Sequence, residues 1–386
     1  MKRIAIFCDG TWNRAEAEHP TNVVRLAQAV RLTAQDGVSQ QVFYVMGVGT
    51  GRGSSLAARM LDRFTGGALG WGLIENIEDA YRALAFCYEP GDEIYITGFS
   101  RGAYTARSLA GLIRSCGIPP RENLARIGEA VARYRSRQAG TRPYDVESYR
   151  FRAEFAPYTV TSPEEWDWRM KHAPGMCVQL KVSYLGVWDT VGALGVPGYW
   201  AVAPLFNSGY QFHDAVLSRS VASARHAVAV DERRRTFPPA LWANLGKLNR
   251  LALGLAPGDP LGGIPREHLP YREEWFAGNH GSVGGGGDLK GLSAYSFAWI
   301  AQGAQRAGLD LRPEILAEVA AEEKLSAALN NKSDPGVWAR LVALRTQDRE
   351  GPEAARHVSD AARARVRADK RYRPKTLAKV MAALLG

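Results

Sequence analysis

The sequence predicts an α/β protein in which a mainly parallel sheet is covered by helices on both faces. Short apolar runs alternate with amphipathic helical segments over the first hundred residues, and the links between them are short. Several of these runs are apolar at successive positions, as expected of strands buried on both faces. The 386 residues are 46% hydrophobic and 23% charged, which suits a large core and excludes disordered or collagen-like chains.

The N-terminal third supplies three strands and three helices in alternation. Apolar, β-rich runs predict strands over residues 3–9, 41–48 and 93–98. Apolar stripes at helical spacing predict helices over residues 21–32, 71–88 and 103–114. This order favours parallel strands with helical crossovers.

The alternation breaks at residues 118–177, which are rich in Arg, Tyr, Pro and Glu. We interpret this segment as an insertion over the sheet, with one helix near residues 122–137. Its aromatic side chains would suit a lid over an apolar pocket, and a plain surface elaboration is the alternative. These side chains are Tyr144, Tyr149, Phe155, Trp166 and Trp168.

The sheet is expected to resume after the insertion. Further strands are predicted over residues 178–188, 224–230 and 274–277, and further helices over residues 293–307 and 313–329. We therefore divide the chain into a main domain, residues 1–330, and a helical C-terminal extension, residues 331–386.

The positive charge is concentrated near the C-terminus. Residues 356–386 hold nine Lys/Arg and two Asp/Glu, whereas the whole chain has a net charge of +10. The segment could be a solvated helix packed on the core, or it could be attracted to an anionic membrane surface. No nucleic-acid-binding pattern accompanies it, so a nucleic-acid partner is not expected.

Composition and the N-terminal residues predict a cytoplasmic location in the producing cell. The apolar run at the N-terminus is short and ends at Asp9, as in a strand and unlike a signal peptide. No run of 18 uncharged apolar residues predicts a transmembrane helix. The four cysteines lack metal-ligand spacing and suit reduced thiols.

Ser100 is the candidate nucleophile because it lies in a Gly-x-Ser-x-Gly motif, residues 98–102. In this motif the serine occupies a strained turn between a strand and a helix, and the flanking glycines allow close backbone packing. A strand-like run precedes the motif and a helical pattern follows it, as the chemistry requires. The alternative is a serine that only caps the helix.

A serine nucleophile needs a base and an acid that orients the base. His280 follows a strand-like run and precedes a glycine-rich loop, which would let its side chain reach the serine. Asp189 ends an apolar strand with few competing charges. Asp231 also ends a strand, but three arginines follow closely. We favour Asp189 and keep Asp231 as the alternative acid.

The backbone amide of Arg101 is expected to bind an oxyanion at the start of the helix. The second amide would come from the loop after the first strand, at Gly10 or Thr11. Asp9-Gly10-Thr11 also matches the end of the D-x-D-G-T motif of haloacid-dehalogenase phosphatases. Phe7 occupies the position of that family's nucleophilic aspartate, which argues against this alternative.

Seven segments together resemble one known family. They occur in order along residues 7–13, 21–23, 44–50, 98–110, 186–191, 226–233 and 275–286. The chain resembles the α/β-hydrolase family of uncharacterised bacterial and fungal proteins that includes type VI secretion phospholipase effectors. The resemblance spans about residues 3–310.

The resemblance implies an α/β-hydrolase fold and phospholipase-type ester cleavage. The family's nucleophile, acid and base fall on Ser100, Asp189 and His280. The family has an aspartate two residues after this histidine, where the present chain has Ser282. The chain also lacks the large membrane-docking extensions of the effectors, so delivery by type VI secretion does not follow.

We therefore expect a serine hydrolase of carboxylic esters, of the lipase, phospholipase or esterase kind, that needs no metal or cofactor. Thioester or amide substrates would use the same residues. The alternative, suggested by Ser282, is a weak or inactive hydrolase fold that binds a partner or membrane through its basic tail.

Overall fold

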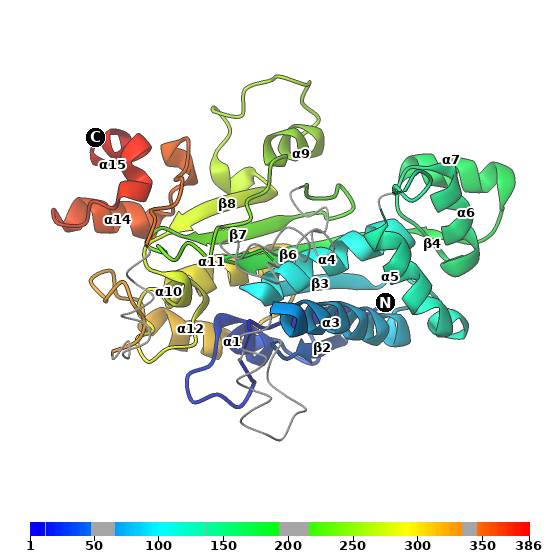
Figure 1. Cartoon of the computed structure of the whole chain (residues 1–386), viewed down its shortest axis with the longest axis horizontal. Coiled ribbons are helices and arrows are strands. Elements are labelled where there is room, and N and C mark those ends of the chain that lie inside the picture. The colour runs from blue at the N-terminus through cyan, green and yellow to red at the C-terminus, as the bar shows by residue number, and fades with distance from the viewer. Residues whose placement is uncertain (12, 48–65, 137, 193–215, 334–345) are drawn as a thin grey trace.

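The structure is a computed structural model that describes the chain except for residues 12, 48–65, 137, 193–215 and 334–345. Its centre is a six-stranded sheet in the order β2-β1-β3-β6-β7-β8 (Figure 1). All five strand pairs are parallel. The strands are β1 (Arg3–Cys8), β2 (Gln40–Val45), β3 (Glu93–Phe99), β6 (Val182–Trp188), β7 (Ala224–Ala229) and β8 (Tyr271–Phe276).

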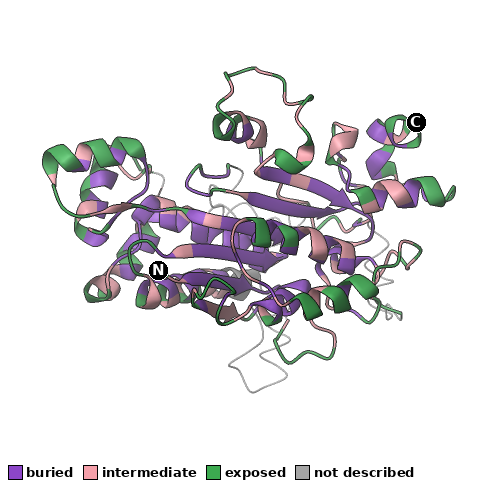
Figure 2. Cartoon of the chain, turned by 180° about the vertical axis from the view of Figure 1, so that it is seen from behind, coloured by how far each residue is buried: buried purple, intermediate pink, exposed green. Residues whose placement is uncertain are grey.

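The sheet is buried on both faces, which explains the apolar runs in its strands. All six residues of β1 are buried, and successive side chains join different clusters. Ile4 and Ile6 pack on one face, whereas Ala5 and Phe7 pack on the other. Figure 2 shows the strands as buried and the outer sides of several helices as exposed.

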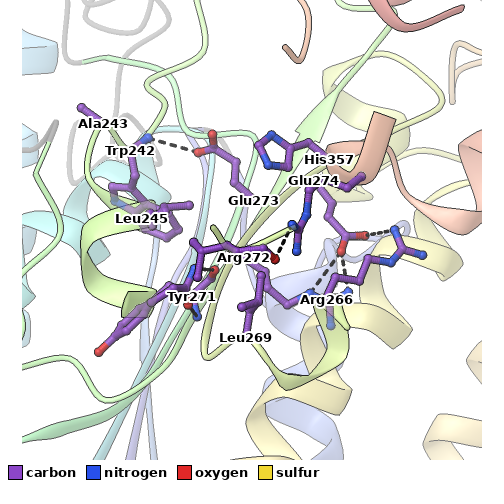
Figure 3. Close-up of a pocket in the computed structure, with 14 residues that line it drawn as sticks. Trp242, Ala243, Leu245, Arg266, Leu269, Tyr271, Arg272, Glu273, Glu274 and His357 are labelled. Carbon is purple, nitrogen blue, oxygen red and sulfur yellow. Dashed lines mark hydrogen bonds and ion pairs between the residues drawn. The ribbon is translucent and has the colours of Figure 1, made fainter. Parts of the chain in front are cut away.

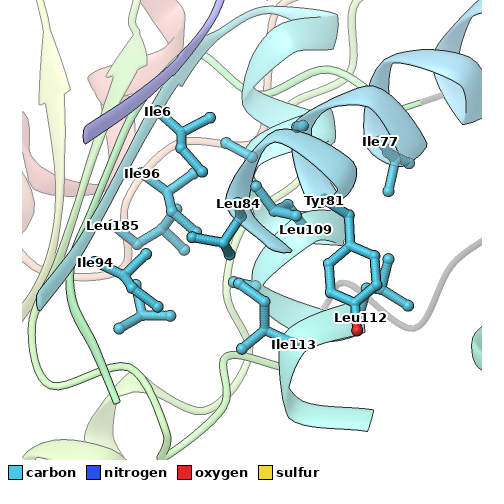
Figure 4. Packing of buried hydrophobic residues seen from close by; sticks show 14 of the residues in the cluster. Ile6, Ile77, Tyr81, Leu84, Ile94, Ile96, Leu109, Leu112, Ile113 and Leu185 are labelled. Carbon is cyan, nitrogen blue, oxygen red and sulfur yellow. The ribbon is translucent and has the colours of Figure 1, made fainter. Parts of the chain in front are cut away.

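Helices cover both faces of the sheet and confirm the predicted fold class. On one face, α3 (Gly66–Cys87) and α4 (Arg101–Cys116) pack on β1, β3 and β6 (Figure 4). On the other face lie α1 (Asn22–Ala29), α11 (Ser293–Arg306) and α12 (Pro313–Ala321). This arrangement is that of an α/β-hydrolase-like fold.

The strand order places a natural binding position between β1 and β3. The chain leaves β1 for β2 in one direction, and the later strands β6, β7 and β8 are added on the opposite side of β3. In open parallel sheets, ligands bind at the carboxyl ends of the strands where the order reverses. The loops that follow β1 and β3 therefore border the expected site.

The described part of residues 118–179, which includes the predicted insertion over residues 118–177, forms a small helical unit with a two-stranded sheet. It contains η1 (Arg121–Arg126), α5 (Ile127–Arg135), α6 (Val146–Phe155), β4 (Thr159–Val160), α7 (Pro163–His172) and β5 (Val178–Gln179). The predicted strand over residues 178–188 is thus divided, since β5 pairs with β4 and only β6 joins the main sheet.

A buried ion-pair network holds this unit against α4. Arg152 donates to Glu165 and also to the carbonyl oxygen of Ser115, in the last turn of α4. Arg169 donates to the other oxygen of Glu165. Ser100 precedes the first turn of α4, so this anchor lies at the opposite end of the helix. The lid role stays a prediction that this placement does not favour.

The C-terminal segment packs on β7 and β8. It contains η3 (Ala355–His357), α14 (Asp360–Ala368), η4 (Lys375–Val380) and α15 (Met381–Leu385). Val358, Val366 and Leu377 are buried in a cluster with Val228 and Trp275. Val358 also forms a parallel bridge with Trp275, so the segment covers the outer edge of β8 (Figure 1).

Several arginines of this segment serve internal contacts. Arg356 donates to the carbonyl oxygens of Leu261 and Ile264, and Arg365 to those of Leu325 and Ala327. Such contacts are those of a helix packed on its own core. Attraction to a membrane surface stays a prediction. No helix in the described part of the chain is long and apolar enough to cross a bilayer.

Two further elements precede β8, and the sequence analysis predicted neither. They are the helix α9 (Leu245–Ala252) and the short η2 (Arg266–His268). The helix predicted over residues 313–329 ends at Ala321, because Glu322 and Glu323 close it with turn hydrogen bonds.

Candidate active site

Ser100 lies at the sharp turn between β3 and α4. Its φ of 59° and ψ of −123° are strained for a residue with a side chain. Its backbone N–H donates to the carbonyl oxygen of Trp188, so the neighbouring strand β6 supports the turn. The residue is 6% exposed. This is the geometry that the Gly-x-Ser-x-Gly motif predicts.

The two glycines of the motif are required by close backbone contacts. A Cβ atom at Gly98 would lie 2.4 Å from the carbonyl oxygen of Gly102. A Cβ atom at Gly102 would lie 2.2 Å from the carbonyl oxygen of Cys8. A side chain at Gly98 would therefore push the start of α4 away from β3, and a side chain at Gly102 would push it away from the end of β1.

His280 reaches Ser100 from the loop after β8. It opens the short helix α10 (His280–Gly284), which is capped by the side chain of Asn279. Nε2 of His280 lies 2.8 Å from Oγ of Ser100. The imidazole also contacts two aromatic rings, with centroid distances of 4.6 Å to Phe99 and 5.0 Å to Phe237.

Asp189 follows β6 and is fully buried. Its φ is 37°, and it shares with Ser100 the distinction of a positive φ among the described non-glycine residues. Oδ2 lies 2.6 Å from Nδ1 of His280, and Oδ1 accepts a hydrogen bond of 2.8 Å from the N–H of Ala229. The serine, histidine and aspartate thus form one continuous hydrogen-bonded chain.

Arg349 is a fourth member of this cluster that the sequence reasoning missed. It lies in the C-terminal segment, is 9% exposed, and donates from Nη1 to Oδ1 of Asp189 at 2.6 Å and from Nη2 to Oδ2 at 3.0 Å. No motif marks Arg349, because it meets Asp189 only through the tertiary fold. A buried carboxylate with one histidine partner could have suggested a cation, but not which one.

Burial and the neighbouring charged groups determine the protonation states of Asp189 and His280. Burial alone would raise the pKa of Asp189, but Arg349 and His280 outweigh it and hold the pKa well below the usual carboxyl range. Burial lowers the pKa of His280 below its ordinary value of 6.5, against the opposing effect of Asp189. At neutral pH the site therefore holds a carboxylate and a neutral imidazole.

This arrangement can activate a hydroxyl group. With Asp189 ionised, Nδ1 of His280 carries the hydrogen that it donates to Oδ2, so Nε2 is free to accept from the hydroxyl of Ser100. A neutral imidazole in that tautomer is the base that a serine nucleophile requires.

The alternative acid, Asp231, lies in a different environment. Its Oδ2 accepts from the N–H of Gly278 and from the hydroxyl of Tyr372, both at 2.7 Å. Its neighbour Glu232 forms the ion pair with Arg234 that the run of arginines suggested for Asp231. Glu232 also accepts a hydrogen bond of 3.2 Å from the backbone N–H of His280. Asp189, not Asp231, contacts the imidazole.

The loop after β1 borders Ser100 and offers one of the two proposed amides. A Cβ atom at Gly10 would lie 3.2 Å from Cβ of Ser100, so the loop is in contact with the serine. The N–H of Gly10 already donates to Asp9 at 2.7 Å. The N–H of Gly10 is thus engaged with the Asp9 carboxylate in this structure.

Ser282, which stands where the resembling family has aspartate, has a structural contact of its own. Its Oγ donates to the carbonyl oxygen of Leu329 at 2.7 Å, and its N–H donates to the capping side chain of Asn279. The hydrogen-bonded chain from Ser100 to Asp189 therefore forms without an aspartate at residue 282.

A cavity of about 270 Å³ lies outside β8, apart from the serine (Figure 3). It is lined by polar and apolar side chains that include Trp242, Glu273 and His357.

A second buried histidine, His226, lies between this cavity and the turn at Asp189. Glu273 accepts a hydrogen bond from Nδ1 of His226, and Nε2 of His226 accepts one from the N–H of Thr190. This second histidine supports the turn next to Asp189 and was not expected.

Comparisons with known proteins agree with the earlier resemblance. Residues 2–303 match the family described as "T6SS, Phospholipase effector Tle1-like, catalytic domain". The uncharacterized protein YEL023C of Saccharomyces cerevisiae is 27% identical over 243 residues, which cover 61% of this chain and 32% of that protein.

Two solved structures are also similar. The crystal structure of an uncharacterized protein from Pseudomonas aeruginosa shares 18% identity, with a TM-score of 0.40, over 83% of this chain and 48% of that one. The Tle1 effector bound to the VgrG spike of the type 6 secretion system shares 17% identity, with a TM-score of 0.37, over 75% and 52%. The chain thus spans about a third to a half of these relatives.

Proposed function

Because this chain belongs to the family of Tle1-like catalytic domains of type VI secretion phospholipase effectors, we propose that it is a serine hydrolase of lipid esters. The observation that carries the proposal is the hydrogen-bonded chain Ser100–His280–Asp189 at the carboxyl ends of β3, β8 and β6. Catalysis by these three residues is part of the proposal.

The reaction follows from the tautomer of His280. Oγ of Ser100 attacks the ester carbonyl carbon while Nε2 of His280 takes the hydroxyl proton. The imidazolium then gives this proton to the departing alcohol oxygen, which leaves an acyl group on Ser100. A water molecule, deprotonated by His280, releases the acid and restores the serine. Asp189 holds the imidazole and stabilises its charged form throughout.

When Ser100 attacks, negative charge develops on the carbonyl oxygen of the substrate ester. Hydrogen-bond donors near the start of α4 must stabilise this charge. We assign this role to the backbone N–H groups of Arg101 and Thr11. Arg101 begins α4, where the helix dipole adds to the effect. Thr11 follows Gly10, which lies against Ser100.

The first test compares hydrolysis of a short-chain nitrophenyl ester and of phosphatidylcholine vesicles. Ser100→Ala should lose activity on both substrates, and Asp189→Asn should lower kcat by about 10⁴-fold through the wrong histidine tautomer. Two matched variants should keep the activity. Ser115→Ala changes a serine in the last turn of the same helix, and Asp231→Asn changes the acid that does not contact His280.

Labelling with a fluorophosphonate gives an independent readout. The wild-type protein should be labelled at Ser100, and Ser100→Ala should not be labelled. Hydrolysis that survives in Ser100→Ala would refute the mechanism. A wild-type protein that neither hydrolyses the substrates nor takes the label would instead support the non-catalytic binding role.

A further inference from the structure

We propose that Arg349 is a positioning residue of the hydrolytic site, and that the C-terminal extension is therefore part of the catalytic machinery. This inference rests on the proposed function, because Arg349 can position a catalytic residue only if Asp189 takes part in catalysis. It starts from the two hydrogen bonds of Arg349 to Asp189, one to each carboxylate oxygen. Such a bidentate pair fixes the plane of the carboxylate as well as its charge.

Arg349 is itself held from two sides. Nη1 also donates to the carbonyl oxygen of Ala229 at 2.9 Å, and Nη2 to that of Phe237 at 2.8 Å. Ala229 ends β7, and its N–H donates to Oδ1 of the same carboxylate. The ring of Phe237 packs edge-on against His280. The guanidinium thus joins the acid, the end of β7 and one wall of the imidazole site.

The segment before Arg349 is docked on the loop that follows β7. Thr346 forms an antiparallel bridge with Arg234, and the N–H of Gln347 donates to the carbonyl oxygen of Arg233 at 2.8 Å. Asp348 accepts from the Arg233 side chain at 2.9 Å. These contacts explain how a residue far along the chain reaches a fully buried carboxylate.

A guanidinium on Asp189 has a defined chemical effect. It keeps the buried carboxylate ionised, and it reduces the attraction that the carboxylate exerts on a protonated His280. The other charged groups that act on the imidazole are Glu232 and Arg234, both from the loop after β7. Loss of Arg349 alone therefore makes the electrostatic potential at the imidazole more negative, which favours the protonated form of His280.

The test is the titration of His280 by NMR of ring-labelled histidine, with His280→Gln for assignment. Arg349→Gln should raise the titration midpoint of His280 by about one pH unit, because one nearby positive charge is lost. Arg349→Lys keeps the charge and should keep the midpoint. A lysine side chain cannot donate to both carboxylate oxygens of Asp189 in the planar geometry of a guanidinium group. Therefore kcat should fall about tenfold with little change in KM.

Arg233→Gln is the matched control. It removes an exposed ion pair with Asp348 and keeps the backbone hydrogen bonds that dock residues 346 and 347, so the midpoint and kcat should match the wild type. The double variant Asp189→Asn, Arg349→Gln should show no further loss of kcat beyond that of Asp189→Asn alone, because Arg349 positions the imidazole through the carboxylate.

An unchanged midpoint in folded Arg349→Gln would overturn the proposal and make Arg349 a structural anchor only. If that variant does not fold, Arg349→Lys decides, and a wild-type kcat there would equally overturn it. The titration needs no turnover. A shifted midpoint in a protein whose hydrolysis does not depend on Ser100 would therefore refute the proposed function while leaving the pairing of Arg349 and Asp189 intact.

Discussion

Ser100 and Asp189 are held in backbone conformations that a side chain normally avoids. Each positive φ costs free energy, of the order of 1–3 kcal/mol, that the surrounding strands must offset. In both residues the strain aims a functional group at His280 from the end of a strand. The sequence motif predicted the strain at Ser100, but no pattern predicted it at Asp189, where the fold imposes it.

The pKa of His280 makes a prediction for the pH dependence of kcat/KM. His280 acts as a base only when it is unprotonated, and burial lowers its pKa below 6.5. Activity should therefore be full at pH 7 and should fall on acidification, with a midpoint below pH 6.5. Measuring kcat/KM on a nitrophenyl ester between pH 4 and 8 gives this midpoint. A midpoint at or above pH 7 would contradict the neutral imidazole that we describe.

At the scale of elements, the unit of α5, α6 and α7 depends on one buried carboxylate. Glu165 is inaccessible to solvent and pairs with Arg152 and Arg169, and it also accepts from the N–H and hydroxyl of Thr161. Two buried guanidinium groups without their anion would be unfavourable. The whole unit is therefore expected to loosen when the charge of Glu165 is lost.

Glu165→Gln should lower the free energy of unfolding by about 3–5 kcal/mol. The control is Glu164→Gln on the same helix, whose exposed pair with Arg219 should contribute less than about 1 kcal/mol. Urea denaturation measures the free energy of unfolding of both variants.

Ester hydrolysis by the same variants tests the lid interpretation of residues 118–177. An altered KM for long-chain esters in folded Glu165→Gln would favour a lid, and an unchanged KM would favour a structural unit.

For the whole molecule, the C-terminal extension covers β7 and β8. Val366 of α14 lies in the cluster that includes Val228 and Trp275 of these strands. Val366→Asp would bury a charge there and should lower the free energy of unfolding by about 3 kcal/mol or more. Arg371→Asp, at an exposed position nearby, is the matched control. Thermal unfolding measures the difference, and equal melting temperatures would show that the extension contributes little to stability.

The parts of the molecule that sequence predicted are those with local signals. Apolar runs located the six main strands, and Gly-x-Ser-x-Gly together with strand-end positions located Ser100, Asp189 and His280. Arg349 and His226 act through contacts between distant segments, and such contacts leave no spacing to detect. The sequence offered the amides of Gly10 and Thr11 equally as oxyanion donors, and the hydrogen bond from the Gly10 N–H to the side chain of Asp9 is the reason for proposing Thr11.

The late position of Arg349 along the chain has a consequence for synthesis in the cell. A ribosome releases the segments with Ser100, Asp189 and His280 well before residue 349. Until then, the carboxylate of Asp189 lacks its cation and β8 lacks its outer cover. A nascent chain would thus carry an incomplete site until residue 349 has left the ribosome.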